Sequence, residues 1–203
     1  MNYLGHLYLA DMDAEHRLGN LMGDWVKGPL DRHALPPRIM AGVRRHRQVD
    51  SNSDQHPIMR RARARFSGRH RRVAGIALDV LWDHFLLRHW PVRSEGSLDA
   101  FLAGCYRDVL NALPACPDHH TRHRIERIIQ EDWIRRYAEL SNVIQAISRI
   151  GLRLSRDPGL HDIGSQLEQL YPALEQDFLE FPLLPGRDQA IPALTGTDGS
   201  LPA

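Results

Sequence analysis

Cysteine and long apolar runs are both scarce in this sequence, and each scarcity excludes a class of protein. The 203 residues include two cysteines, Cys105 and Cys116, which are too few for a disulfide-stapled scaffold and typical of a reducing compartment. No stretch approaches the roughly 18 uninterrupted apolar residues that a membrane span needs. The N-terminus has no basic region before its apolar residues, which argues against a secretory signal. We therefore expect a soluble cytoplasmic protein with no membrane partner.

The sequence also lacks the alternation of apolar and polar residues that predicts β-strands. Helical periodicity runs almost throughout, and Pro or Gly residues stand where helices should begin or end. We predict an all-α fold, with a single-domain helical bundle over residues 1–181 and a poorly packed, Pro- and Gly-rich tail over residues 182–203. The predicted helices span residues 2–11, 15–27, 36–49, 57–66, 70–90, 97–113, 118–137, 139–155 and 163–180.

The motifs of several common protein classes are missing. The chain has no GxxxxGK[ST], GxGxxG or CxxC, so nucleotide-loop, Rossmann and zinc-ribbon proteins find no support. The run HHTRH at 119–123 has a spacing that can bind zinc, but its second residue is His where a metalloprotease helix has Glu. Its charged neighbours indicate a solvated helix start. Cys105 has no evident catalytic partner and is expected in the core.

Positive charge is concentrated in one segment, although the net charge of the whole chain is only +1. Residues 38–72 contain eleven Arg and two acids, Asp50 and Asp54, so the segment carries +9 and the rest of the chain −8. A basic face of this kind attracts a polyanion, such as a nucleic acid, a phosphate group or an acidic protein. The run RRARAR at 60–65, taken alone, is more typical of a solvated helix surface.

The predicted helix at 70–90 is apolar on nearly every side, which is typical of a buried helix, yet it carries Asp79, Asp83 and His84. Asp79 and Asp83 are four residues apart and therefore share a face. Two buried carboxylates this close need a proton, a cationic side chain or a metal ion beside them. Arg72 is the alternative partner, in a structural Asp–Arg network. Two Asp with an adjacent His favour the metal ion.

Two further groups could supply metal ligands. His46 and Asp50 are four residues apart on one predicted helix, and His56 follows before Pro57; the alternative is a helix cap and a surface pair. His6 lies in an apolar run, where a histidine is more often a satisfied core residue. Asp24 follows Gly23 and could face a site or pair with Lys27 on the surface. Gly19 and Gly23 allow another backbone to approach closely.

Several stretches together resemble the bacterial acyl carrier protein phosphodiesterases. They are MNYLGHLYLA at 1–10, GNLMGDWVKG at 19–28, GVRRHRQVD at 42–50, SDQHP at 53–57 and RRVAGIALDVLWDHFLLRHW at 71–90. The resemblance implies an all-helical fold distantly similar to HD-type metal-dependent phosphohydrolases, although the adjacent pair Asp83-His84 reverses the order that gives those enzymes their name. It implies a divalent-cation hydrolase, with Mn²⁺ as the expected ion. Its expected reaction removes 4′-phosphopantetheine from the serine of holo acyl carrier protein.

The residues and the resemblance together yield a set of expected roles. The expected metal ligands are His6, Asp24, His46, Asp79 and Asp83. The expected catalytic residues are Asp24, Asp50, His56 and His84, acting as general acid, as support for the ligands or as a further ligand. Arg47 and Arg72 are expected to bind the phosphodiester. The arginines expected to guide the acidic carrier protein are Arg60, Arg61, Arg63 and Arg65.

Three other functions compete with this hypothesis. An HD-like nucleotide phosphohydrolase would share the metal but act on free nucleotides. A non-enzymatic helical module could bind nucleic acid through the Arg-rich segment, but few aromatic residues flank that segment and the Asp79/Asp83 pair would have no role. A purely structural interaction protein is the third alternative. We expect acyl carrier protein rather than nucleic acid as the partner.

Overall fold

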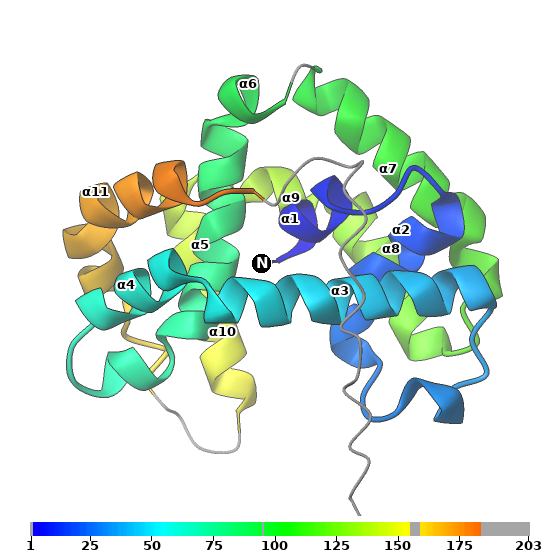
Figure 1. Ribbon diagram of the computed structural model, residues 1–203, viewed down its shortest axis with the longest axis horizontal. Helices are drawn as coiled ribbons and strands as arrows, with labels where there is room; N and C mark the ends of the chain where they lie inside the picture. The colour runs from blue at the N-terminus through cyan, green and yellow to red at the C-terminus, as the bar shows by residue number, and fades with distance from the viewer. Residues whose placement is uncertain (1, 95, 155–158, 184–203) are drawn as a thin grey trace, which may run out of the picture.

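Helix α5 (Ala74–Arg88) stands near the middle of the structure, and several other helices pack against it (Figure 1). The computed structural model describes residues 2–94, 96–154 and 159–183. The predicted tail at 182–203 lies almost entirely outside this part. Helices and turns account for the fold of the described residues, which contain no β-strand, so the all-α prediction is confirmed.

The helices follow one another with short connections. Their bounds are α1 Tyr3–Tyr8, α2 Ala14–Leu21, α3 Pro37–Gln55, α4 Pro57–Arg65, α5 Ala74–Arg88, α6 Trp90–Arg93, α7 Leu98–Ala112, α8 His119–Gln130, α9 Trp133–Arg136, α10 Leu140–Arg153 and α11 Gly164–Glu180. Short 3₁₀ turns are η1 Gly23–Trp25, η2 Leu30–Arg32, η3 Gly68–Arg72 and η4 Leu113–Ala115.

Local chemistry explains where several helices begin and end. Asp13, Ser97 and Asp118 cap α2, α7 and α8 by accepting hydrogen bonds from backbone N–H groups in the first turn. The predicted helix at 118–137 is instead two helices, because Asp132 adopts a left-handed φ of 47°. Its carboxylate accepts hydrogen bonds from Tyr106 and Arg135, which hold the break. The predicted helix at 70–90 begins only at Ala74, after η3.

The core forms where α5 meets its neighbours. α1, α4, α10 and α11 all contact α5. An aromatic cluster joins α5 to the end of α11, with Trp82 edge-on to Phe178 and Phe181. Cys105 is fully buried on α7, as predicted. The close packing of α2 on α3 depends on Gly19, where a Cβ atom would lie 2.0 Å from the carbonyl oxygen of Ile39.

An ion-pair cluster fastens α4 to α11. Asp177 is completely buried, and its carboxylate accepts hydrogen bonds from Arg61 (Nε, 2.7 Å) and Arg65 (Nε, 2.6 Å). Arg61 also pairs with Glu180, and Arg63 pairs with Asp54. These three arginines of the basic run therefore hold helices together, and Arg60 is left exposed on the surface.

Candidate metal centre and adjoining cavity

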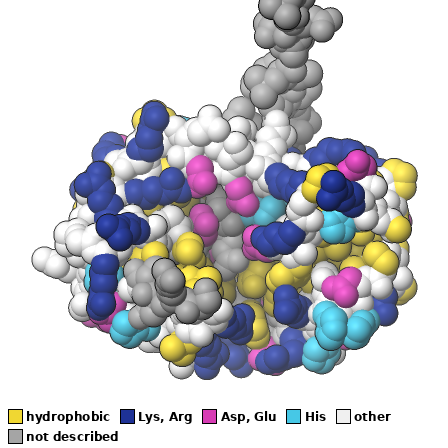
Figure 2. Space-filling model, turned by 90° about the horizontal axis from the view of Figure 1, so that it is seen from below, with side chains coloured by type: hydrophobic (Ala, Val, Ile, Leu, Met, Phe, Trp, Pro, Cys, Tyr) yellow, Lys and Arg dark blue, Asp and Glu magenta, His cyan; other side chains and the backbone are white. Residues whose placement is uncertain are grey.

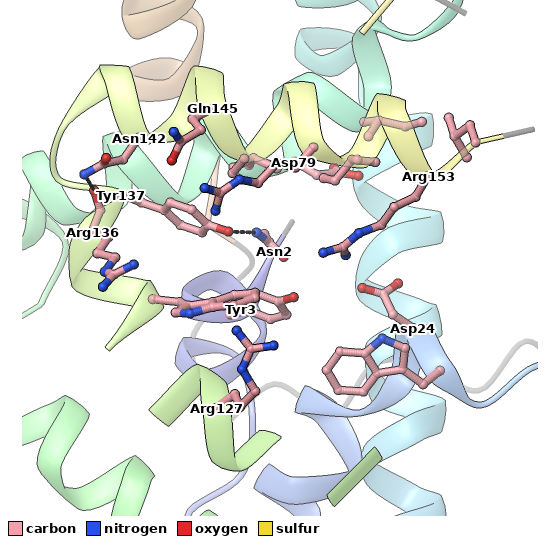
Figure 3. A pocket seen from close by; sticks show the side chains of 18 of the residues that line it. Asn2, Tyr3, Asp24, Asp79, Arg127, Arg136, Tyr137, Asn142, Gln145 and Arg153 are labelled. Carbon is pink, nitrogen blue, oxygen red and sulfur yellow. Dashed lines mark hydrogen bonds between the residues drawn. The ribbon is translucent and has the colours of Figure 1, made fainter. Parts of the chain in front are cut away.

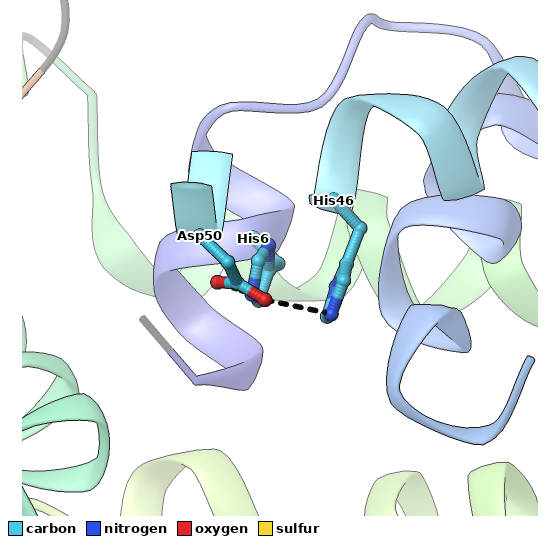
Figure 4. Close-up of side chains that lie close together, drawn as sticks. All are labelled: His6, His46 and Asp50. Carbon is cyan, nitrogen blue, oxygen red and sulfur yellow. Dashed lines mark ion pairs between the residues drawn. The ribbon is translucent and has the colours of Figure 1, made fainter. Parts of the chain in front are cut away.

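Two histidines and an aspartate meet where α1 crosses α3 (Figure 4). His6 comes from α1, and His46 and Asp50 come from consecutive turns of α3. One ligand atom from each of the three side chains lies within 4.8 Å of the others, and no further set of three such residues comes together elsewhere in the described chain. We call these three residues the His/Asp cluster. The sequence spacing that paired His46 with Asp50 is thus realised on one helix face.

The side chains of the cluster are close enough to share a cation. The rings of His6 and His46 stack with their centroids 3.8 Å apart. Asp50 places Oδ1 3.2 Å from Nε2 of His6 and Oδ2 3.1 Å from Nε2 of His46. Asp24, from η1, adds a fourth group, with Oδ1 3.5 Å from Nε2 of His46. This donor set of two imidazoles and two carboxylates suits a divalent metal ion.

The surrounding backbone fixes the ring of His46 and the main chain at His6. Nδ1 of His46 lies 2.9 Å from the carbonyl oxygen of Asn20, and the Asn20 side chain donates to the carbonyl oxygen of His6 at 2.9 Å. Gly23 leaves room for the His46 ring, because a Cβ atom there would lie 2.2 Å from Cγ of His46. Asn20 thereby links α1, α2 and α3, and Nε2 of His46 is directed at the carboxylates.

Burial and charge set opposite protonation tendencies for the two histidines. Burial lowers the pKa of His6 to about 4, so its imidazole is neutral near pH 7. Burial also disfavours the charged form of His46, but its hydrogen bonds to Asp24 and Asp50 prevail and raise its pKa to about 9. Burial would raise the pKa of Asp50, yet the two imidazoles hold it well below its usual range. The cluster therefore keeps a positive charge between its carboxylates.

His6 carries the feature that points most directly to a missing ligand. Both of its ring nitrogens are buried, and neither makes a hydrogen bond within the described part of the chain; the approach of Nε2 to Asp50 is an ion-pair distance outside hydrogen-bond alignment. A buried polar atom without a hydrogen bond costs about 1–3 kcal/mol. A metal ion bound by His6, His46 and Asp50 would satisfy Nε2, so the residues present fit a divalent cation.

A cavity of about 850 Å³ opens beside the cluster, within the usual range for small-molecule sites (Figure 3). Asp24 and Asp50 line its cluster end. Its walls combine aromatic and aliphatic side chains with amides and cations. These are Asn2, Tyr3, Trp25, Lys27, Ile76, Asp79, Val80, Arg127, Trp133, Arg136, Tyr137, Asn142, Gln145, Ala146, Arg149, Ile150, Arg153 and Leu154.

A smaller recess of about 390 Å³ shares Asp24, Lys27 and Asp50 with the larger cavity. Its other lining residues are Gly23, Val26, Gly28, His46 and Arg47. The cluster is therefore reached from both hollows. Figure 2 shows one face of the molecule, on which Lys and Arg side chains spread around a small central group of acidic side chains. Such a field favours an anionic ligand.

Asp83 does not join the cluster. It is completely buried, and its two carboxylate oxygens accept hydrogen bonds from the backbone N–H groups of Leu4 (2.8 Å) and Gly5 (3.0 Å). Asn2, the residue before α1, provides no side-chain cap, so Asp83 caps that helix from α5. Burial raises the pKa of Asp83 to about 7. The structure thus gives Asp83 a part in holding α1, the helix that carries His6.

Asp79 lies apart from both the His/Asp cluster and the cap that Asp83 provides. It is half-buried and lines the larger cavity, where burial raises the pKa of its carboxyl group. The expected pair of Asp79 and Asp83 on one face is thus divided between a cavity wall and a helix cap, and neither belongs to the His/Asp cluster.

The two other histidines expected near the reaction have structural partners. Nδ1 of His56 accepts a hydrogen bond from the N–H of Ile58 and so caps α4, and its ring packs edge-on against Phe181. His84 is buried, with Nδ1 2.7 Å from the carbonyl oxygen of Tyr137 and Nε2 2.7 Å from the hydroxyl of Tyr171. His84 thus ties α5 to α11 and to the chain between α9 and α10. The structure brings neither histidine to the cluster.

The two arginines expected to bind the phosphodiester are also placed differently. Arg47 lines the smaller recess, but Nη2 donates to the carbonyl oxygens of Val26 and Gly28, at 2.8 Å each. It thereby holds the loop after Asp24, where Gly28 has a φ of 79°. Arg72 is exposed on η3 and is not among the lining residues of either hollow in the described chain.

Sequence reasoning missed the C-terminal half of the site. The cavity wall formed by α8, α9 and α10 contributes four arginines and two amides, none of which was predicted. In the sequence these residues lie on amphipathic helices, where exposed arginines have the same pattern whether they face a cavity or bulk water. Arg149 and Arg153 are four residues apart, the one spacing that hints at a shared face.

An all-helical fold that places a His/Asp cluster at the end of a cation-lined cavity is suited to an anionic ligand beside a candidate metal site. The sequence model of the family described as acyl carrier protein phosphodiesterase matches residues 1–183, and the chain belongs to that family. It is similar to acyl carrier protein phosphodiesterases from Serratia proteamaculans (39% identity) and Yersinia pestis (38% identity). Each alignment covers 89% of this chain and 93% of the relative.

The comparison with solved structures gave no match, and neither did a search for membrane-spanning helices in the described part of the chain. No solved structure is significantly similar to this chain, so the expected likeness to HD-type enzymes stays a prediction. Among the described helices, none combines the length and the apolar character needed to cross a bilayer.

Proposed function

We propose that the protein hydrolyses the phosphodiester that links 4′-phosphopantetheine to the serine of holo acyl carrier protein. The products are apo carrier protein and 4′-phosphopantetheine. The observation that carries the proposal is the His/Asp cluster at the end of a cation-lined cavity, in a chain that belongs to the acyl carrier protein phosphodiesterase family. We expect the protein to act in the cytoplasm.

The cluster is the proposed site of a divalent cation, and Mn²⁺ is the ion we expect because the site is rich in carboxylates. His6, His46 and Asp50 would hold it, with Asp24 as a fourth ligand or a partner to water. When bound there, a divalent cation supplies Lewis-acid polarisation of the phosphodiester and of water. Asn20 and Gly23 keep the His46 ring aligned, and Asp83 keeps α1 in place beneath His6.

Asp24 is the proposed proton acceptor. Its side chain is half exposed and lines both hollows, so it can reach a water molecule that approaches the phosphorus atom. Transfer of a proton to Asp24 makes that water a better nucleophile. As the oxygen of that water bonds to phosphorus, the bond between phosphorus and the serine oxygen breaks. The serine oxygen takes up the proton that Asp24 accepted, which restores the hydroxyl of apo carrier protein. Lys27, which lines both hollows, offsets the negative charge of the phosphodiester.

The larger cavity is the proposed site of the 4′-phosphopantetheine arm. The arm joins a phosphate to a chain with two amide groups, and the cavity offers cations at its walls together with the amides of Asn2 and Gln145. Trp25 and Tyr3 provide apolar surface for its methylene and methyl groups. The carrier protein, which stays outside, is expected to meet the basic face, where exposed Arg60 remains a proposed contact.

The test is to incubate the protein with holo acyl carrier protein and Mn²⁺ and to weigh the carrier protein by mass spectrometry. We expect it to lose the mass of 4′-phosphopantetheine and to be a substrate for re-attachment of the arm. A chelator should stop the reaction. A carrier protein that keeps its arm, with free nucleotides hydrolysed instead, would contradict the proposal and favour the nucleotide phosphohydrolase.

A further inference from the structure

The guanidinium of Arg153 lies in the larger cavity, at the end near the His/Asp cluster. The side chain extends from the last turn of α10 into the cavity, toward Asp24 and Asn2 (Figure 3). No carboxylate of the described residues forms an ion pair with it. Its side chain is exposed, and its guanidinium lines a hollow that Asp24 and Asp50 also line.

Arg149, one turn earlier on α10, lines the same cavity. Three further arginines near the site are engaged or more distant. Arg127 pairs with Glu131 at 2.9 Å and lies over the ring of Trp133. Arg136 lies beside Tyr137 and Asn142, on the opposite side of the cavity from Asp24 (Figure 3). Arg47 donates to two backbone carbonyls. Arg153 thus combines free donors with a position next to the cluster.

A well-packed helix holds Arg153 in this position. α10 packs against α5, and Val143 and Ile147 on its inner face are completely buried. A rigid helix limits the positions that the guanidinium can reach. A cation in the last turn is also favoured by the helix dipole, but that gain is about 0.3–1 kcal/mol and does not depend on where the side chain points. The dipole therefore explains the residue type and not its direction.

We propose that Arg153 binds the non-bridging oxygens of the substrate phosphodiester, beside the His/Asp cluster. The inference rests on the proposed function and specifies how that site recognises its phosphate. A guanidinium matches two phosphate oxygens with parallel N–H donors, so it both orients the phosphorus and offsets charge that grows during hydrolysis. This role replaces the one that the sequence suggested for Arg47 and Arg72.

The test compares Arg153→Gln and Arg153→Lys with wild type, using Mn²⁺ and holo carrier protein. We expect kcat/KM to fall on the order of 100-fold for Arg153→Gln. Arg153→Lys should keep part of the activity, because lysine supplies the charge without the planar fork. Mn²⁺ affinity and thermal stability should stay at wild-type values.

In Arg153→Ala, added guanidinium ion should restore part of kcat. Arg107→Gln is the control, since Arg107 is exposed on α7, pairs with Asp108 and lines neither hollow.

Two outcomes would overturn the inference. Activity of Arg153→Gln equal to that of wild type would remove Arg153 from the site. A loss of activity matched by a loss of Mn²⁺ affinity, without guanidinium rescue, would assign it a structural role. If wild type itself left holo carrier protein intact, the proposed function would fail separately. The affinity of wild type and Arg153→Gln for inorganic phosphate would then test the role of Arg153 by itself. Weaker binding by the variant would support the inference, and equal binding would refute it.

Discussion

The molecule buries two groups of aspartate and histidine side chains, and their hydrogen bonds differ. On α5, both oxygens of Asp83 accept backbone N–H groups, and both ring nitrogens of His84 lie within hydrogen-bond distance of an oxygen. At the crossing of α1 and α3, both nitrogens of His6 are buried without a hydrogen bond. The fold supplies hydrogen-bond partners to the first group, but it supplies none to His6 in the second, which is why we propose a ligand there.

The presence or absence of hydrogen-bond partners distinguishes buried structural residues from candidate site residues better than residue type does. The sequence made Asp79, Asp83 and His84 look like the stronger metal site because they lie on the most apolar helix. A buried carboxylate is tolerated, however, wherever backbone donors satisfy it. The useful question for each buried polar atom is therefore whether the fold itself supplies its partner.

The largest expected effect is a loss of catalysis when the His/Asp cluster is changed. Asp50→Ala removes a carboxylate that contacts both imidazoles, so we expect hydrolysis of holo carrier protein to fall more than about 1000-fold. The side chain is half-buried near the end of α3, and helix content by circular dichroism should be unchanged. Asp83→Asn should keep measurable hydrolysis. Equal loss in both variants would erase the distinction between the two groups.

A smaller effect is expected on stability when Asp177 is changed, because the fold supplies both of its ion-pair partners. Asp177→Asn removes the charge that Arg61 and Arg65 share, so the unfolding free energy should fall by about 3 kcal/mol. Urea denaturation measures it. Activity of the folded variant should stay near wild type. Arg60→Gln, which removes a surface cation without an ion pair to a described residue, is the matched control for lost charge. A large rise of KM in Asp177→Asn would show instead that Arg61 and Arg65 act in docking.

The smallest expected effect is a pH dependence that comes from Asp83. Its pKa is raised to about 7 in the fold, against about 3.9 in an unfolded chain, so the folded state holds its proton more tightly. The stability contributed by this group is therefore greatest at low pH and declines as pH rises from about 4 to about 7, by at most about 1.4 kcal/mol per pH unit. The Asp83→Asn variant lacks this decline.

The measurement compares unfolding free energies of wild type and Asp83→Asn at pH 5 and pH 7. Comparing the two pH values cancels the fixed cost of replacing a carboxylate oxygen with an amide. We expect the variant to gain relative to wild type at the higher pH. A difference that is the same at both values would show that Asp83 stays ionised throughout.

The sequence predicted much of the fold and part of the site, for physical reasons that the particular residues make clear. Helical periodicity, Pro and Gly punctuation and N-caps such as Asp13 are local signals, so the all-α architecture could be predicted. His46 and Asp50 could be paired because one helix fixes their spacing. The cap that Asp83 provides could not be predicted, because its donors, Leu4 and Gly5, lie 79 and 78 residues away.

The position of Arg153 was equally hidden. Whether an exposed arginine faces water or a cavity depends on how α10 packs against α5, and no local pattern records this. The family resemblance was carried by the first ninety residues, so it offered no guide to the wall formed by α8, α9 and α10. Long-range packing therefore decides the part of the site that the sequence left open.

The central claim is that a divalent cation binds at the crossing of α1 and α3. Anomalous diffraction from crystals grown with Mn²⁺ tests it most directly. We expect a manganese peak in contact with His6, His46 and Asp50, and no peak beside Asp83. A peak bound by Asp79 or Asp83, or an empty cluster in crystals of protein that is active with Mn²⁺, would contradict the account.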